Sequence, residues 1–282
     1  MSRIDGRPEV DTGTDLKPPA GLQLVALDID DTLIPMRGTL APEVADAVRA
    51  VRAAGLEVVL ATGRGITDVV HLAEGLGLPE FWALCSNGSV TARVSGGSFA
   101  IDGRITLDPR PVVTALRALD PDAPVAIEQS GLGFLVDGNP FPGQAPHVAG
   151  SIGDLPAEVT FLSIASTVLR EEELMSLADG QPLRAVPYPH EGWVTIDIVH
   201  ESAGKGAALA ALADRLGIPA ASCAAIGDYF NDIPMLEWAG WSVAMGQAPD
   251  AVKAVADAVA PSVSEHGAAQ ALTAIAIAAR AQ

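Results

Sequence analysis

The chain has 282 residues, of which 49% are hydrophobic, and its formal net charge is −18 at pH 7. This size allows one large domain or two modest ones, and the acidic balance excludes nucleic acid as an expected partner, because that partner requires a basic face. The only cysteines are Cys85 and Cys223, without CxxC or zinc spacing, so neither a disulfide scaffold nor a zinc site is expected.

Residues 1–20 mix charges, glycine and proline without an apolar centre, and we interpret them as a disordered tail. No apolar window is long enough to span a bilayer, so no membrane association is expected. The sparse use of cysteine favours a reducing cytoplasm. Nothing in the sequence indicates an oligomeric state.

An apolar run at residues 22–27 is followed at once by Asp28, Asp30, Asp31 and Thr32. Such a run is typical of a strand buried on both faces. In open parallel sheets, ligands bind beyond the carboxyl ends of the strands. Three neighbouring carboxylates repel one another unless a cation binds them, and a hard cation such as Mg²⁺ suits oxygen ligands. An acidic turn that merely ends the strand is the alternative.

The next segments alternate between helix and strand and predict a parallel sheet with right-handed crossovers. A glycine closes the first helix where a C-cap belongs, and Thr62-Gly63-Arg64 follows the second strand. The predicted elements are a helix at 42–55, a strand at 56–61, a helix at 67–76 and a strand at 82–85.

The pattern changes after Ser86-Asn87-Gly88, because Asn-Gly is a strong hairpin signal and short alternating stretches follow. This middle block predicts an α+β unit with antiparallel pairing, and its segment 137–153 is interpreted as an irregular loop. Helices are expected at 111–119 and 170–178. Strands are expected at 89–94, 98–101, 104–107, 125–128, 134–136, 160–166, 183–186 and 193–199.

From Gly204 the parallel pattern returns, with a helix to Leu216 and a strand at 222–226 that ends at Gly227-Asp228. A helix, a short strand at 241–244 and two more helices complete the chain. The predicted fold class is α/β, with a Rossmann-like parallel-sheet core made of residues 21–87 and 199–282. An α+β cap domain is expected as an insertion at residues 88–198.

Four features distant in the sequence are thus expected at one edge of the core sheet. They are Asp28/Asp30/Thr32, Thr62-Gly63-Arg64, Lys205, and Asp228/Asn231/Asp232. Phosphoryl transfer to a carboxylate needs a nucleophile, a proton donor for the leaving oxygen, cations that neutralise the phosphate, and a metal that lowers anion–anion repulsion. These residue types supply all four requirements.

The combination resembles the haloacid dehalogenase superfamily of phosphohydrolases, and within it the Cof-type branch (subfamily IIB, with a C2 cap). The resemblance covers residues 22–87 and 200–270 and includes the stretch 244–248. Three positions depart from the family pattern. Asp31 stands where many members have glycine, Gln247 replaces the usual asparagine, and His266 stands where an acid is common.

The resemblance implies a nucleophile at Asp28 and a general acid and base at Asp30. Thr62 and Lys205 would hold the phosphate. The implied metal ligands for Mg²⁺ are Asp28, Asp30 through its backbone carbonyl, Asp228 and, through water, Asp232. The expected phosphate- or substrate-binding residues are Thr32, which would also brace the nucleophile loop, Gly63, Arg64, Asn87 and Asn231. Arg64 could equally be an ion-pair partner at a helix start, and Asn87 could simply form a turn.

The sequence therefore predicts a Mg²⁺-dependent phosphatase for small phosphorylated metabolites, with sugar phosphates as the expected class. The cap would select the substrate, and Glu128, His190 and Trp193 are candidates for that role by residue type and loop position. The alternatives are a sugar phosphomutase, which uses the same groups, and a non-catalytic protein that binds a phosphorylated metabolite. A dehalogenase fits less well, since a halide leaving group needs no proton from Asp30.

Overall fold

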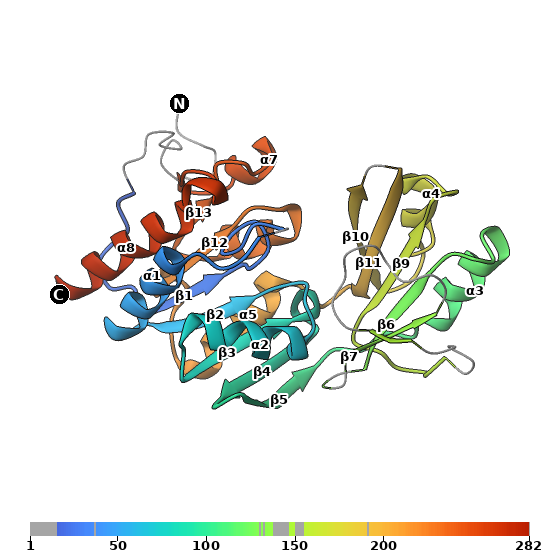
Figure 1. The fold of residues 1–282 in the computed structure, drawn as a ribbon, viewed down its shortest axis with the longest axis horizontal. Helices are drawn as coiled ribbons and strands as arrows, with labels where there is room; N and C mark the ends of the chain where they lie inside the picture. The colour runs from blue at the N-terminus through green and yellow to red at the C-terminus, as the bar shows by residue number, and fades with distance from the viewer. Residues whose placement is uncertain are drawn as a thin grey trace.

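The computed structural model describes residues 16–281, except 37, 130, 132, 138–146, 150–154 and 191. Its strands form one sheet of eight strands and one of six, which lie next to each other along the long axis (Figure 1). Among the described residues, no helix combines the length and apolar character needed to cross a membrane. The expected tail falls mostly outside the described part of the chain.

The eight-stranded sheet has the order β14-β13-β12-β1-β2-β3-β4-β5. Its strands run parallel from β14 to β3, whereas β4 and β5 form an antiparallel hairpin at one edge. All four residues of β1 are buried, as expected for a strand covered on both faces. The strands are β1 Leu24–Leu27, β2 Glu57–Ala61, β3 Glu80–Cys85, β4 Val90–Ser95, β5 Ser98–Arg104, β12 Cys223–Gly227, β13 Trp241–Ala244 and β14 Ala258–Val259.

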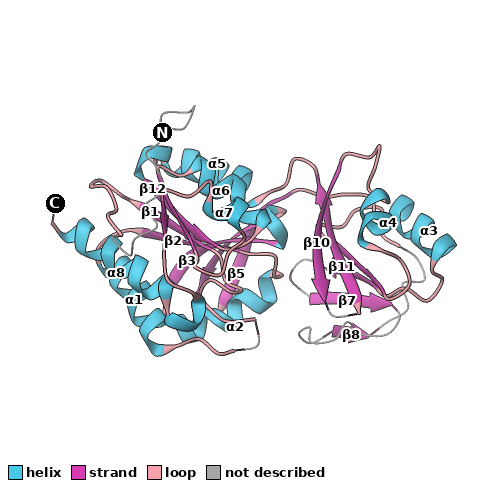
Figure 2. Cartoon of the chain, turned by 90° about the horizontal axis from the view of Figure 1, so that it is seen from above, coloured by secondary structure: helices cyan, strands magenta, loops and turns pink. Residues whose placement is uncertain are grey.

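Helices cover both faces of this sheet (Figure 2). One face packs against α1, α2 and α8, with Val48 and Ile66 in the shared core, and the other packs against α5, α6 and α7 with Leu209 and Val252. Gly217, at φ 69°, ends α5 as a left-handed C-cap. We call the sheet and these helices the core. The helices are α1 Pro42–Ala53, α2 Ile66–Leu76, α5 Lys205–Leu216, α6 Ile233–Trp238, α7 Asp250–Lys253 and α8 Gly267–Arg280.

The six-stranded sheet has the order β10-β11-β9-β6-β7-β8, antiparallel except for the β7–β8 pair. Helices α3 and α4 pack on one face through Leu116 and Leu174, and the opposite face is turned toward the core (Figure 2). We call this unit the cap. Its elements are α3 Arg110–Leu119, β6 Val125–Gln129, β7 Gly133–Asp137, β8 His147–Ala149, β9 Leu162–Ser166, α4 Glu171–Ser176, β10 Leu183–His190 and β11 Trp193–His200.

The α/β class and the parallel-sheet core are confirmed, but the first expected boundary of the insertion is wrong. The sequence places the cap from residue 88, yet β4 and β5 extend the core sheet beyond β3. The reason is that the tight turn Ser86–Gly88 sends the chain back along β3 as a hairpin. In addition, the expected strand at 104–107 is reduced to a bridge between Leu107 and Val159, and the expected loop contains β8.

Candidate active site

The polar groups predicted to converge do lie at one edge of the core sheet. Asp28 directly follows β1, Thr62 follows β2 and Asp228 follows β12. These three strands are neighbours and parallel, so their carboxyl ends meet. Lys205 is the first residue of α5, and its side chain reaches the same edge, where it contacts Asp28. The cap lies opposite this edge (Figure 1).

Lys205 links the nucleophile candidate to a second carboxylate. Its Nζ donates to Asp28 Oδ1 and to Asp232 Oδ1, each at 2.6 Å. All three side chains are buried. Burial disfavours the charged amine, but Asp232 and Asp28 outweigh this effect and raise the pKa of Lys205. The lysine is therefore a fixed positive charge beside the carboxylate that would accept a phosphoryl group.

Asp28, Asp228 and Asp232 each present a carboxylate oxygen within 4.8 Å of the others. Burial, followed by repulsion from Asp232, raises the pKa of Asp28 and brings the pKa of Asp228 to about 7. Lys205 opposes both shifts but supplies only one positive charge. Such a concentration of hard oxygen donors suits Mg²⁺, which prefers carboxylates and water. Among the described residues, Asp30 is not a member of this group.

The loop after β12 is built around Asp232. Its Oδ2 accepts hydrogen bonds from the backbone N–H groups of Asp228 and Tyr229, at 2.9 and 3.0 Å. A Cβ at Gly227 would lie 2.6 Å from the Asp232 carboxyl carbon, so only glycine leaves room for this carboxylate. Asp232 therefore orients Asp228 as well as contacting Lys205.

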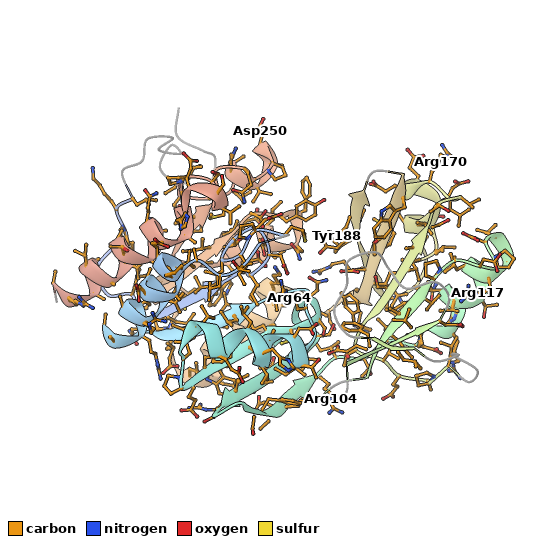
Figure 3. The ribbon with its side chains drawn as sticks, in the orientation of Figure 1. Arg64, Arg104, Arg117, Arg170, Tyr188 and Asp250 are labelled. Atoms are coloured by element: carbon orange, nitrogen blue, oxygen red, sulfur yellow. The ribbon has the colours of Figure 1, made fainter. Side chains whose placement is uncertain are left out.

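Asp30 and Arg64 form a bidentate ion pair across the ends of β1 and β2. Arg64 Nε donates to Oδ2 at 2.9 Å, and Arg64 Nη2 donates to Oδ1 at 2.6 Å. Of the two roles that the sequence leaves open for Arg64, the structure shows the ion pair. Both side chains stay about 30% exposed, at 33% and 28%, and Figure 3 shows Arg64 at the side where the core faces the cap.

The expected phosphate-binding loop is ordered by its own backbone. Thr62 Oγ1 accepts the N–H of Arg64 at 3.0 Å, which leaves the hydroxyl hydrogen of Thr62 able to donate to another oxygen. Gly63 lies next to Asn87, whose side chain would be 3.4 Å from a Cβ added at that glycine. Asn231 Nδ2 donates to Asn87 Oδ1 at 2.8 Å. Thr32 is buried and donates to Asp228 Oδ1 at 3.3 Å, so its observed contact is with a metal-ligand candidate.

Each of the three departures from the family pattern has a structural counterpart. Asp31 has φ 55°, a conformation that favours glycine, and its carboxylate accepts the N–H of Met36 at 2.7 Å. Gln247 Nε2 donates to the Asp31 carbonyl at 2.5 Å and lies 3.4 Å from Asp228 Oδ2. Gln247 is not among the site residues expected from the sequence, whereas the structure puts it in contact with a metal-ligand candidate. The third, His266, has φ 57° and pairs with Glu43.

Of the three cap residues suggested by the sequence, Glu128 is buried and accepts from the Ser86 hydroxyl of the core. Trp193 is half-buried against Ala126, Val136 and Ala165 of the cap sheet, and the side chain of His190 lies outside the described residues. A further cap residue, Tyr188, also reaches the site (Figure 3). Its ring stacks on Tyr229 with centroids 5.4 Å apart, and its hydroxyl oxygen accepts from Asn231 Nδ2 at 3.2 Å.

Burial and then the charges of Asp197, Asp232 and Asp28 raise the pKa of Tyr188. The available signal in the sequence was an aromatic residue just after the expected strand at 183–186, two positions before His190; the structure extends that strand to His190. A cavity of about 260 Å³ lies between β10 and the start of α5. Its polar lining includes Asn87, Arg184, Lys205 and Asn231.

Comparison with known proteins identifies relatives of this architecture. A family model described as haloacid dehalogenase-like hydrolase matches residues 25–108 and 164–272. The phosphatase YwpJ of Bacillus subtilis is 29% identical over 280 residues, covering 87% of this chain and 97% of that protein. The pyridoxal phosphate phosphatase YbhA of Escherichia coli is 29% identical, covering 84% and 92%. A solved haloacid dehalogenase-like hydrolase from B. subtilis gives a TM-score of 0.73 at 26% identity, covering 89% and 99%.

The family match includes both segments that contribute to the site. Asp28, Thr62, Lys205 and Asp228 all fall within the matched residues, and the structure brings them to one sheet edge. The relatives named here also cover the inserted cap, because they align over nearly their whole length. The chain therefore belongs to the haloacid dehalogenase-like hydrolases, in the Cof-type branch of phosphatases.

Proposed function

We propose that this phosphatase hydrolyses small phosphate monoesters in a Mg²⁺-dependent reaction that passes through an aspartyl-phosphate at Asp28. The observation that supports this most directly is the contact of Lys205 Nζ with Asp28 Oδ1 at 2.6 Å, beside the carboxylates of Asp228 and Asp232. A buried carboxylate next to a fixed cation is a suitable acceptor for a phosphoryl group, because its own charge and that of the phosphate are partly neutralised.

The chain's own residues then divide the chemistry between them. Asp28 attacks phosphorus, while Lys205 and the hydroxyl of Thr62 hold phosphate oxygens. Asp30 donates a proton to the leaving alkoxide and later takes one from the attacking water. In the described structure Asp30 is held by Arg64, so Arg64 must release or share this carboxylate when substrate binds. The guanidinium is then available for the phosphate, which is the second role that the sequence allows.

The carboxylates of Asp28, Asp228 and Asp232 would hold Mg²⁺, with the carbonyl of Asp30 as a further expected ligand. The bound cation would neutralise charge on the phosphate and on its ligands. Thr32 and Gln247 contact Asp228 from two sides and would fix its orientation.

Sugar phosphates are the substrate class that we propose first. Support comes from polar side chains around the core–cap cavity, including Asn87 and Asn231, which can donate to and accept from hydroxyl groups. The stacked pair Tyr188 and Tyr229 favours a second candidate, a phosphate ester of an aromatic ring. One relative bears the name of a pyridoxal phosphate phosphatase, so that ester belongs in the same test.

The test is phosphate release from p-nitrophenyl phosphate, a panel of sugar phosphates and pyridoxal phosphate, with Mg²⁺ or with EDTA. We expect turnover only with Mg²⁺, and we expect Asp28→Asn to lower kcat by at least about 10³-fold, because the nucleophile is lost. Asp46→Asn, an exposed acid on α1, is the matched control and should retain wild-type rates.

Each rival reading predicts a different result. A folded, Mg²⁺-replete protein that releases no phosphate from any ester would overturn the proposal. Isomerised sugar phosphate without free phosphate would instead establish a phosphomutase, which uses the same carboxylates. Tight binding of a sugar phosphate without turnover would establish a non-catalytic binding protein.

A further inference from the structure

The turn between β3 and β4 contains two consecutive strained residues. Ser86 and Asn87 both have φ 53°, in the left-handed region, and both are buried. This conformation costs about 1–2 kcal/mol for a residue such as serine and less for asparagine, whose short polar side chain tolerates it better. Their backbone N–H groups donate to the carbonyls of Arg64 and Thr62, at 2.9 and 3.0 Å. The strained turn therefore supports the loop that is proposed to bind phosphate.

The side chain of Ser86 is held by the cap. Its hydroxyl donates to Glu128 Oε2 at 2.5 Å, and the hydroxyl of Thr160 donates to the same oxygen at 2.7 Å. Glu128 lies on β6 and is only 4% exposed. Burial raises its pKa, whereas hydrogen bonds from Ser86, Thr160 and the backbone of Ile66, at the start of α2, oppose that rise. One cap carboxylate thus joins three donors, two of which belong to the core.

A second cap carboxylate, Asp197, lies near the side chain of Asn87. Asp197 on β11 accepts from the hydroxyl of Ser163 at 2.8 Å. Asn87 Nδ2 is buried without a hydrogen bond of ordinary geometry, yet its amide is close enough to Asp197 to lower the pKa of that carboxyl. Burial has the larger effect and raises this pKa to about 7. Asp197 is half-buried.

The two contacts repeat one arrangement. In each, a cap carboxylate accepts from a hydroxyl of the cap and lies near a polar side chain of the strained turn. We propose that Glu128 and Asp197 are positioning residues, which hold Ser86 and Asn87 to the cap and thereby fix the loop Thr62–Arg64 for phosphate binding. The role in the reaction rests on the proposed function, whereas the mechanical link between cap and loop does not.

Stability alone is a poor explanation for these carboxylates. Burying an ionisable group is costly, and apolar residues of similar size often stabilise a protein as well or better. Here two such groups lie where the cap meets the strained turn, and each lies beside a different residue of that turn. Asp120 provides a contrast, because this buried cap carboxylate also accepts from a serine hydroxyl, Ser166 at 2.7 Å, but both partners belong to the cap.

The experiment compares Glu128→Gln and Asp197→Asn with the matched control Asp120→Asn. The first readout is hydrogen exchange of the backbone amides of residues 62–66 and 86–88, measured without substrate. We expect exchange of the Ser86 and Asn87 amides to accelerate about tenfold in the two test variants, as for loss of a hydrogen bond to a charged group. Asp120→Asn should leave these amides within twofold of wild type.

The second readout is kcat/KM for p-nitrophenyl phosphate, which should fall about tenfold in each test variant and not in Asp120→Asn. In a Ser86→Ala background, Glu128→Gln should have little further effect on exchange or rate. If Glu128→Gln does not fold, Thr160→Val removes only the cap-side donor and should show the same pattern more weakly.

Unchanged exchange in both test variants would overturn the proposal, as would equal acceleration in Asp120→Asn. A wild-type protein without phosphatase activity would overturn the proposed function, while the exchange measurement would still decide whether Glu128 and Asp197 fix the loop.

Discussion

Single residues of the site carry an excess of negative charge that their surroundings do not balance. Asp28, Asp228 and Asp232 lie within 4.8 Å of one another, and Lys205 is the one cation that contacts this group in the described structure. Gln247 adds a neutral donor to the same group. Because metal ligands depend on such supporting contacts, we expect Gln247 to influence how tightly Mg²⁺ is held.

Replacing Gln247 by alanine removes its contacts with Asp228, the Asp31 carbonyl and the N–H of Val263. We expect the Mg²⁺ concentration for half-maximal activity to rise about 10- to 100-fold, with a smaller effect on kcat at saturating Mg²⁺. Gln270→Ala, on an exposed position of α8, is the control. An unchanged Mg²⁺ requirement would show that the contact with Asp228 is incidental.

Asp197 should give the protein a specific dependence of stability on pH. Its folded-state pKa of about 7 lies above the ordinary value of 3.8. The folded protein therefore binds this proton more tightly than the unfolded chain. Its contribution to stability is complete below about pH 4 and is lost as the pH rises through 7. Tyr188 interacts electrostatically with Asp197, but burial raises the pKa of its phenol above the ordinary value of 10.0. Tyr188 therefore stays protonated over this pH range.

Urea unfolding at pH 5 and pH 8 checks this expectation. The free energy of unfolding should fall between these pH values by a few kcal/mol less in Asp197→Asn than in wild type. Asp228 titrates in the same range in both proteins, so the difference isolates Asp197. Parallel pH dependences would mean that Asp197 is ionised at pH 5 in the folded state.

The sequence predicted the chemical groups of the site better than their contacts. Asp28, Lys205 and Asp228 were recognisable because each adjoins the end or start of a predicted core element. Tyr188 and the contact of Gln247 were not, because they depend on side chains that approach from the cap or from a distant loop. Arg64 remained open between two roles for the same reason, since its partner Asp30 is 34 residues away.

Among the elements, the turn Ser86–Gly88 has the most demanding local geometry. Gly88 has φ 86°, and a Cβ at this position would lie 2.4 Å from the carbonyl oxygen of Gly204. The start of the β3–β4 hairpin therefore touches the chain where it returns from the cap to α5. Two glycines allow these backbones to approach so closely.

Gly88→Ala should destabilise the protein by more than its backbone strain alone. Gly97 offers a matched control, because its φ is 73° but nothing lies within 4 Å of an added Cβ. Strain at a positive φ costs about 1–2 kcal/mol at both sites, and a forced shift of packed backbone adds about 1–3 kcal/mol at Gly88 only. Equal losses of unfolding free energy in the two variants would show that the contact with Gly204 relaxes freely.

The same turn explains the largest error in predicting the elements. Asn-Gly correctly indicated a hairpin, but nothing in residues 89–104 shows which sheet the hairpin joins. Its pairing with β3 follows from the direct chain connection at Ser86–Gly88, since the returning strand lies beside the one it leaves. The parallel part was predictable because its buried strands are continuous apolar runs separated by amphipathic helices.

On the scale of the whole molecule, a net charge of −18 sets the response to cations. Any salt screens surface repulsion and raises stability somewhat. A specific site adds a separate contribution, because a ligand that binds only the folded state stabilises it by an amount that grows with the logarithm of the ligand concentration above its dissociation constant.

Mg²⁺ at 100 times its dissociation constant should raise the free energy of unfolding by about 2.7 kcal/mol over NaCl of equal ionic strength. Thermal unfolding measures the shift, and EDTA should reverse it. Asp228→Asn should abolish the Mg²⁺-specific part and keep the general salt effect. A Mg²⁺ shift equal to that of NaCl in the wild type would contradict a built cation site.

The position of β1 in the sheet has a consequence for the order in which this protein can form during translation. One neighbour of β1 is β2, made soon afterwards, but the other is β12, whose residues Cys223–Gly227 emerge almost 200 positions later. The cap strands, by contrast, are contiguous and complete before β12 is synthesised. Until then an apolar central strand has an open edge on the ribosome, so nascent chains stalled before residue 223 should engage chaperones more than those released after it.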